Sequence, residues 1–280
     1  MTQIMDQVPD PTNRKDPQAE QDAKISSALG KIKNKFLVMS GKGGVGKTST
    51  AVNLSIALAS RGFKVGIMDV DLHGPDVPRM LGLNGTLDVG PNQKLNPASY
   101  SDNLKAVSVE SLMPSKDDAV IWRGPIKYSA IQQFIGDVDW GELDFLVIDA
   151  PPGTGDEPLT VAQIVKDAQA IIVTTPQEVA LADVRKSISF CNRVNMEIFG
   201  IIENMSGLTC PHCDELIELF GSGGGEKTAS QFNLNFLGRI PIDPNVVLCG
   251  DSGKCFRDTH ADSGVNRAFD AIAEKMSKLV

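Results

Sequence analysis

The stretch "GKGGVGKTST", residues 41–50, constrains this chain more than any other part of its sequence. It matches the template G-x-x-x-x-G-K-[ST] of a phosphate-binding loop and adds a second lysine, Lys42. The apolar run "KFLVMS" before it is typical of a buried strand, and "KTSTAVNLSIALASRG" after it has apolar residues at helical spacing. Because strand, loop and helix come in the order that a phosphate site requires, we expect the start of this helix to face bound phosphate.

The residues of this loop have separate predicted roles. Glycines allow consecutive backbone N–H groups to turn toward an anion. In this template Lys47 contacts the β- and γ-phosphates of a nucleotide, and the Thr48 hydroxyl binds Mg²⁺. The residues predicted to bind the nucleotide are Gly41, Lys42, Gly43, Gly44, Val45, Gly46, Lys47, Thr48 and Ser49.

Strand-like apolar segments recur along the chain and alternate with helical ones. We expect strands at residues 36–40, 64–70, 103–110, 143–149, 169–174, 198–203 and 236–242. We expect helices at about residues 48–61, 75–82, 126–137, 157–167, 178–194, 224–233 and 264–279. This alternation predicts an α/β fold, with a mainly parallel twisted sheet covered by helices on both faces. A single domain would span residues 25–280, and the polar, proline-containing residues 1–24 are expected to form a disordered or flexible tail.

Composition narrows the classes of function. The net charge of −8 disfavours non-specific nucleic-acid binding as the main activity. The sequence shows no signal-peptide pattern and no apolar run of membrane-spanning length. We therefore expect a cytoplasmic protein that binds neither nucleic acid nor membrane.

Three aspartates lie at or directly after the carboxyl ends of predicted strands. Asp69 and Asp71 lie in "IMDVDLHGPDVPRML", and Asp149 lies in "LDFLVIDAPPGTGDEPLT". Ligands of open α/β sheets bind at the carboxyl ends of the strands, where these side chains would meet the phosphate loop. We expect a catalytic role for Asp71, and less so for Asp69, and we expect Asp149 to help hold Mg²⁺. Ordinary polar residues in strand-to-helix turns are the alternative for the first two.

All five cysteines lie in the last third of the chain. Cys210 and Cys213 stand two residues apart in the segment 207–215, a spacing that lets two thiolates face one metal centre. They supply half of a four-thiolate site, which would suit an iron–sulfur cluster or zinc. A thiol–disulfide oxidoreductase is a further alternative, although such a motif should open a helix of a small thioredoxin-like domain. We expect Cys191 in the core and place Cys249 and Cys255 outside the site.

Seven motifs occur in one order along the chain: "GKGGVGKTST", "DVDLHGPDVPRMLG", "WRGP", "VIDAPPGTGD", "IENMSG", "CPHC" and "FGSGGGE". Together they resemble the Mrp/ApbC branch of the MinD-like P-loop ATPases, which are iron–sulfur cluster carriers. The resemblance runs from about residue 25 to the C-terminus. It implies a homodimer in which Lys42 reaches the nucleotide of the facing subunit and stabilises phosphate charge in trans.

The resemblance also implies roles for residues outside the loop. Asp71 aligns with the acid that positions or activates the attacking water, and Asp149 aligns with the acid of the second switch segment. Asn204 falls where relatives hydrogen-bond the adenine base, which favours ATP, and a structural asparagine at a strand-end turn is the alternative. The implied catalytic set is Lys42, Lys47, Asp71 and Asp149.

The implied cargo is a 4Fe–4S cluster that bridges the two subunits. Cys210 and Cys213 of each subunit would hold it, and the carrier would deliver it to apo iron–sulfur proteins in a cycle timed by slow ATP hydrolysis. The alternative is a ParA/MinD-type positioning ATPase in which the cysteines form a structural zinc clip. Such a protein would need a basic amphipathic tail, whereas the terminal stretch "GVNRAFDAIAEKMSKLV" mixes acidic and basic residues and is typical of a packing helix.

Overall fold

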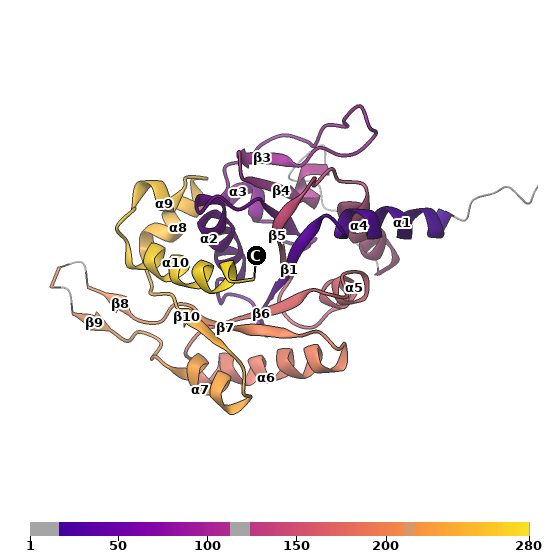
Figure 1. Ribbon diagram of the computed structural model, residues 1–280. Coiled ribbons are helices and arrows are strands. Elements are labelled where there is room, and N and C mark those ends of the chain that lie inside the picture. The colour runs from indigo at the N-terminus through magenta and orange to yellow at the C-terminus, as the bar shows by residue number, and fades with distance from the viewer. Residues whose placement is uncertain (1–16, 113–123, 211, 214, 280) are drawn as a thin grey trace, which may run out of the picture.

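The computed structural model describes residues 17–112, 124–210, 212–213 and 215–279. Its centre is an eight-stranded sheet with the strand order β10-β7-β6-β1-β5-β2-β4-β3. Only β3 runs antiparallel to its neighbour, at one edge of this sheet (Figure 1). The strands are β1 (Ile32–Met39), β2 (Val65–Asp69), β3 (Ala98–Ser101), β4 (Leu104–Ser108), β5 (Leu143–Asp149), β6 (Gln169–Thr174), β7 (Ile198–Glu203) and β10 (Phe236–Arg239). The predicted α/β fold with a mainly parallel sheet is confirmed.

Helices cover both faces of the sheet and enclose two apolar cores. The first core lies under α2 (Lys47–Ser60), α3 (Val77–Met80), α8 (Pro244–Asp251), α9 (Phe256–Thr259) and α10 (Gly264–Ser277). The second lies under α1 (Pro17–Leu29), α4 (Gly124–Gly136), α5 (Asp156–Ile164), α6 (Glu178–Arg193) and α7 (Gly224–Gln231). Because both faces are covered, the central strands contain continuous buried apolar runs, such as "FLVM" in β1 and "AIIV" in β6, as their sequences indicated.

The N-terminal boundary differs from the prediction. Residues 17–24, expected to belong to a flexible tail, are the first part of α1. This helix packs along α4 and buries Ile25 and Ala28 against the second core. Its polar composition and weak apolar periodicity hid it, since only two of its side chains are buried. Residues 1–16 lie outside the described part of the chain.

A second, two-stranded sheet projects from the body of the molecule (Figure 1). It is a hairpin of β8 (Leu208–Thr209) and β9 (Leu216–Ile217), inserted between β7 and α7. Its base is joined to the chain that follows β10 through a bridge between Leu208 and Ile242. Within the predicted metal segment 207–215, Leu208 and Thr209 form β8, and Cys210 and Cys213 come between β8 and β9 in the chain.

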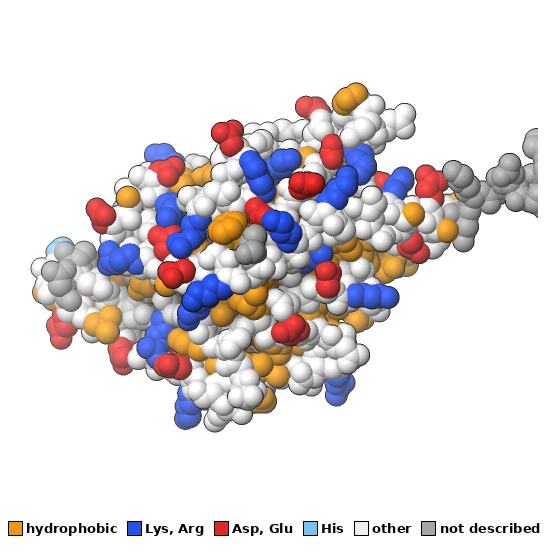
Figure 2. All heavy atoms as spheres, in the orientation of Figure 1, with side chains coloured by type: hydrophobic (Ala, Val, Ile, Leu, Met, Phe, Trp, Pro, Cys, Tyr) orange, Lys and Arg blue, Asp and Glu red, His pale blue; other side chains and the backbone are white. Residues whose placement is uncertain are grey.

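The charge distribution on the surface is relevant to nucleic-acid binding, and the length and polarity of the helices are relevant to membrane insertion. Acidic and basic side chains are interspersed over the face shown in Figure 2. Among the described residues, the helices are all too short or too polar to cross a bilayer.

Candidate functional site

The sheet topology brings the predicted nucleotide residues to one edge. β1 leads into the phosphate loop, β5 lies beside β1, and β2 lies beside β5. In the parallel register Asp149 is aligned with Val38 of β1 and with Asp69 of β2. The ends of three strands that are far apart in sequence therefore surround the N-terminus of α2.

Lys47, Thr48 and Asp149 form a hydrogen-bonded group at this point. The Lys47 ammonium donates to Asp149 Oδ1 at 2.7 Å and to Thr48 Oγ1 at 3.1 Å, and Thr48 Oγ1 donates to Asp149 Oδ2 at 2.7 Å. Asp149 is fully buried and Lys47 is 7% exposed. Burial raises the pKa of Asp149, although Lys47 and Thr48 act to lower it. The hydroxyl and carboxylate oxygens in this group are hard donors of the kind that Mg²⁺ prefers.

The glycines of the loop meet specific steric demands. Gly44 and Gly46 have φ angles of 80° and 77°, in the left-handed region that favours glycine. A Cβ on Gly41 would lie 2.4 Å from the backbone carbonyl group of Asp183 in α6. The loop is therefore held close to α6 and curled over the N-terminus of α2, as a phosphate-binding loop requires.

Asp69 and Asp71 have different surroundings. Asp69 is fully buried and accepts hydrogen bonds from the backbone N–H groups of Asp71, at 3.0 Å, and Val77, at 3.3 Å. Burial raises the pKa of Asp69 well above its usual value, and the nearby Asp149 carboxylate adds to the rise. Asp71 lines the open cavity beside the phosphate loop. Asp69 therefore shapes the segment that carries Asp71, and only Asp71 is placed to meet a ligand.

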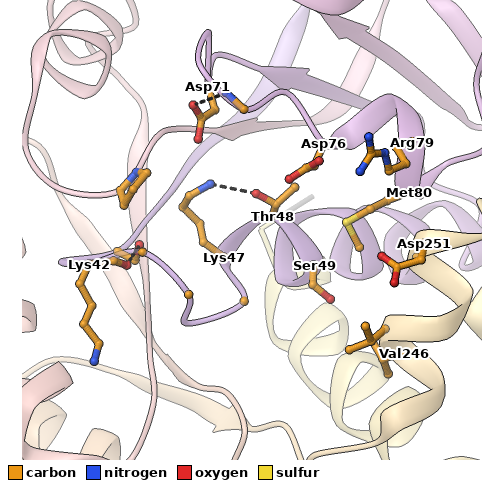
Figure 3. A pocket seen from close by; sticks show the side chains of 18 residues that line it. Lys42, Lys47, Thr48, Ser49, Asp71, Asp76, Arg79, Met80, Val246 and Asp251 are labelled. Atoms are coloured by element: carbon orange, nitrogen blue, oxygen red, sulfur yellow. Dashed lines mark hydrogen bonds between the residues drawn. The ribbon is translucent and has the colours of Figure 1, made fainter. Parts of the chain in front are cut away.

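A cavity of about 520 Å³ opens beside the phosphate loop. The loop and Asp71, which were predicted to serve a nucleotide, line one side of it. The other side was not predicted, and it is formed by residues before and within α3 and by residues of α8 (Figure 3): Asp76, Arg79, Met80, Val246, Val247, Gly250 and Asp251. The sequence "DP" at Asp243 and Pro244 was the available signal for α8, because an aspartate N-cap followed by proline is typical of a helix start.

The two lysines of the loop point in different directions. Figure 3 shows the Lys47 ammonium directed at Thr48, while the Lys42 side chain extends away from this group on the far side of the loop. The backbone of Lys42 is fixed, because its carbonyl oxygen accepts a hydrogen bond of 2.9 Å from the Ser40 hydroxyl. The Lys42 side chain thus points away from Lys47 and Thr48 in its own chain (Figure 3).

Asn204 lies behind the loop. Its side-chain N–H₂ donates to the carbonyl oxygen of Val45 at 2.9 Å, and its backbone N–H donates to Thr174 at 2.7 Å. The residues that line the cavity do not include it. This bond gives Asn204 a structural contact with the loop, and its predicted contact with adenine stays a prediction.

The hairpin carries the cysteine pair. Cys213 is exposed and Cys210 is half-buried, and the Cys210 N–H donates to the carbonyl oxygen of Glu215 at 2.9 Å. The backbone N–H groups of His212 and Cys213, together with the Cys213 thiol, hydrogen-bond the Cys210 sulfur and lower its pKa. The structure therefore brings the two thiols together and favours the thiolate form that binds metals.

The other cysteines are packed elsewhere. Cys191 is fully buried, as predicted, with its sulfur 3.6 Å from that of Met39. Cys249 is buried beside Thr259. In the described part of the chain, no cluster of three or more histidine, cysteine or acidic side chains could hold a metal ion. One chain thus offers two thiolates at the hairpin and no third ligand from this part.

Comparison with known proteins identifies relatives over most of the chain. Residues 31–277 match the family model of ParA, described as the NUBPL iron-transfer P-loop NTPase. An iron-sulfur cluster carrier protein of Methanocaldococcus jannaschii is 47% identical over 261 residues, which cover 92% of this chain and 90% of that protein. A cytosolic Fe-S cluster assembly factor of Dictyostelium discoideum, a NUBP2 homolog, is 51% identical over 231 residues, covering 80% of this chain and 87% of that protein.

Solved structures agree with these matches. A nucleotide-binding protein of Archaeoglobus fulgidus in complex with ADP has a TM-score of 0.74 and 39% identity, and the match covers 83% of this chain and 91% of that chain. The septum site-determining protein MinD of Pyrococcus horikoshii, complexed with Mg-ADP, has a TM-score of 0.64 and 24% identity, and covers 88% of this chain and 96% of that chain. The latter likeness shows that the fold is shared.

Proposed function

Because the chain belongs to the NUBPL iron-transfer branch of the ParA family of P-loop NTPases, we propose that it is an ATP-dependent iron–sulfur cluster carrier. The observation that carries the proposal is the presence of two sites in one folded unit. One is the group of Lys47, Thr48 and Asp149 beneath the phosphate loop, and the other is the pair Cys210 and Cys213 on a projecting hairpin. Relatives named as cytosolic assembly factors support a cytosolic place of action.

The nucleotide site suits ATP with Mg²⁺. The loop backbone and Lys47 would hold the β- and γ-phosphates, and the oxygens of Thr48 and Asp149 would hold the metal ion directly or through water. Asp71, at the open side of the cavity, would orient the attacking water. The Lys42 side chain points away from Lys47 and Thr48 of its own chain (Figure 3). It would complete the nucleotide site of a second subunit.

The thiol site is incomplete in one chain, and this supports a homodimer. A four-iron cluster takes four thiolates, and each hairpin offers two. Two hairpins meeting on a twofold axis would hold one cluster between subunits. The hairpin projects from the body of the molecule, so a cluster there would also be accessible to an apo-protein (Figure 1). Zinc suits the same thiolates, and metal analysis separates the two.

The first experiment is anaerobic reconstitution with iron and sulfide, followed by iron and sulfide counts and visible absorption spectra. We expect about four irons per dimer in the wild-type protein and fewer than about one in the Cys210→Ala/Cys213→Ala double variant. The matched control is Cys249→Ala/Cys255→Ala, which also removes two thiols and should retain the cluster. A wild-type protein that takes up zinc but no cluster, or a double variant that retains the iron, would contradict the proposal.

A positioning ATPase with a zinc clip is the less favoured alternative. The relatives that are 44–51% identical are named as iron–sulfur cluster carriers or assembly factors, whereas the MinD structures are at most 24% identical. The terminal stretch predicted to pack does so, since α10 buries Phe269, Ile272 and Met276 in the first core.

A further inference from the structure

Glu203, the last residue of β7, has a buried carboxylate that neither proposed site uses. Its side chain is fully buried, yet four groups surround its two oxygens. Oε1 accepts hydrogen bonds from the Ser206 hydroxyl at 2.6 Å and from the Gly223 N–H at 3.0 Å, and it lies 3.4 Å from Arg239 Nε. Oε2 accepts a bond from the Gly225 N–H at 2.5 Å. Charge-assisted bonds in a dry environment are strong, so this arrangement is rigid.

The two hydrogen-bond donors to Oε1 come from opposite ends of the cysteine hairpin. Ser206 precedes β8, and Gly223 follows β9. A single oxygen of Glu203 thus closes the base of the segment that carries Cys210 and Cys213. We call Glu203, Ser206, Gly223 and Gly225 the hairpin clamp. Both ends of the hairpin are therefore bonded to the same carboxylate.

The glycine-rich stretch "GSGGGE" is built to receive this carboxylate. Gly223 has a φ angle of 79°, which favours glycine. A Cβ on Gly225 would lie 3.0 Å from the Glu203 Cβ, and one on Gly224 would lie 2.6 Å from the carbonyl oxygen of Pro176. Larger side chains here would push α7 away from β7 and open the clamp. The N-terminus of α7 also places its partial positive charge beside the carboxylate.

The next residue after Glu203 connects the clamp to the phosphate loop. The Asn204 side chain donates to the carbonyl oxygen of Val45 in that loop, as described above. The loop packs closely on it, because a Cβ on Gly46 would lie 2.2 Å from the Asn204 nitrogen. Two adjacent residues therefore hold the phosphate loop on one side and both ends of the hairpin on the other.

We propose that the hairpin clamp transmits the nucleotide state of the phosphate loop to the cysteine pair, with Ser206 and Glu203 as positioning residues. The proposal rests on the proposed function, since it needs a nucleotide at the loop. When phosphate draws the loop N–H groups toward it, the peptide that carries the Val45 carbonyl turns and Asn204 follows. Because Glu203 is rigidly bonded to both hairpin ends, the hairpin turns with it, and the exposure of Cys210 and Cys213 changes.

The test uses the full-length protein without a cluster and measures the alkylation rates of individual cysteines by peptide mass spectrometry. Rates are compared with and without MgADP. The buried Cys191, whose pKa burial raises to about 12, serves as the slow internal reference. The variant is Ser206→Ala, and the matched control is Ser222→Ala. The Ser222 hydroxyl also donates to a glutamate carboxylate at 2.6 Å, but that partner is the exposed Glu218, outside the clamp.

In the wild type and in Ser222→Ala, MgADP is expected to change the rates at Cys210 and Cys213 about fivefold or more. In Ser206→Ala the change should fall below about twofold, and Ser206→Thr, which keeps the hydroxyl, should retain it. A full response in Ser206→Ala overturns the proposal, as does a loss of response in Ser206→Thr.

Nucleotide affinity is measured in the same samples by titration with a fluorescent ADP analogue. If the wild type binds ADP but the alkylation rates of Cys210 and Cys213 do not change, the proposed coupling is refuted. The cluster-carrier function is then tested separately by the reconstitution experiment. If the wild type binds no nucleotide at all, the proposed function fails and the coupling fails with it.

Discussion

Replacing Lys47 with methionine removes its charge and keeps most of its length, and it should destabilise the nucleotide-free protein strongly. Asp149 would remain fully buried with no cation, close to the buried Asp69 carboxylate. Removing one member of a buried ion pair costs about 3–5 kcal/mol, and we expect Lys47→Met to lower the free energy of unfolding by this amount near neutral pH.

The loss of unfolding free energy caused by Lys47→Met should grow as the pH rises. Burial raises the pKa of Asp149 even with Lys47 present, and the loss of Lys47 raises it further. An acid whose pKa is higher in the folded state binds more protons there, so stability falls as the pH rises through the interval between its unfolded and folded pKa values. The unfolded value is about 3.9. The destabilisation by Lys47→Met is therefore expected to be largest at about pH 7 and smaller at about pH 5.

The measurement is urea unfolding followed by circular dichroism, in EDTA and without nucleotide, on Lys47→Met, Asp149→Asn and the double variant. Asp149→Asn should cost less than Lys47→Met, because it also removes the repulsion between Asp149 and Asp69. The double-mutant cycle should give a coupling energy of about 2–3 kcal/mol.

The matched control is Lys35→Met. Lys35 is as buried as Lys47 and lies 2.7 Å from Asp167, the same distance as in the Lys47 pair, but the Asp167 side chain is 64% exposed. Lys35→Met should therefore lower the free energy of unfolding by at most about 1 kcal/mol. Equal losses for Lys47→Met and Lys35→Met, additive effects in the cycle, or a penalty that grows at low pH would refute the reasoning.

Two further predictions concern the loop itself. Lys42→Ala should lower the rate of phosphate release from ATP about a hundredfold or more, and an excess of Lys47→Ala subunits, which still supply Lys42 in trans, should restore it; if mixing restores nothing, Lys42 does not act across subunits. Gly46→Ala should weaken ADP binding far more than Gly44→Ala, because a Cβ at Gly46 would lie 2.2 Å from the Asn204 nitrogen, while one at Gly44 would meet open space. The strain at Gly44 alone is about 1–2 kcal/mol, and equal ADP affinities for the two variants would contradict the steric argument.

The central strands and the phosphate site could be predicted because local sequence encodes them. Buried parallel strands are apolar throughout, and the loop needs its glycines in fixed places. The antiparallel β3 was missed because its sequence "ASYS" sits at the sheet edge with alternate residues exposed. Likewise α1 buries only Ile25 and Ala28, which is too few for a clear helical period.

The parts of the site that escaped prediction depend on contacts between distant residues. Glu203 and Gly225 lie in the motifs "IENMSG" and "FGSGGGE", but the sequence did not indicate their contact, because they are twenty-two residues apart in the chain. The resemblance assigned Asn204 to the adenine base, whereas its bond to Val45 joins residues 159 positions apart, which local sequence does not encode. The part of the cavity wall formed by α8 could not be predicted, because it depends on the packing of α8 against α3.

The strand order itself explains why a cargo loop and a nucleotide loop should affect one another in this fold. β7 is separated from β1 only by β6, and all three run parallel, so their carboxyl ends lie on one edge of the sheet. A hairpin inserted directly after β7 must start at that edge, two strands from the loop that follows β1 and within reach of its Val45 through Asn204. The same insertion after β4, on the other side of the sheet, would start three strands away from β1, beyond β5 and β2. The position of the hairpin in the chain, as much as its cysteines, therefore suits it to respond to nucleotide.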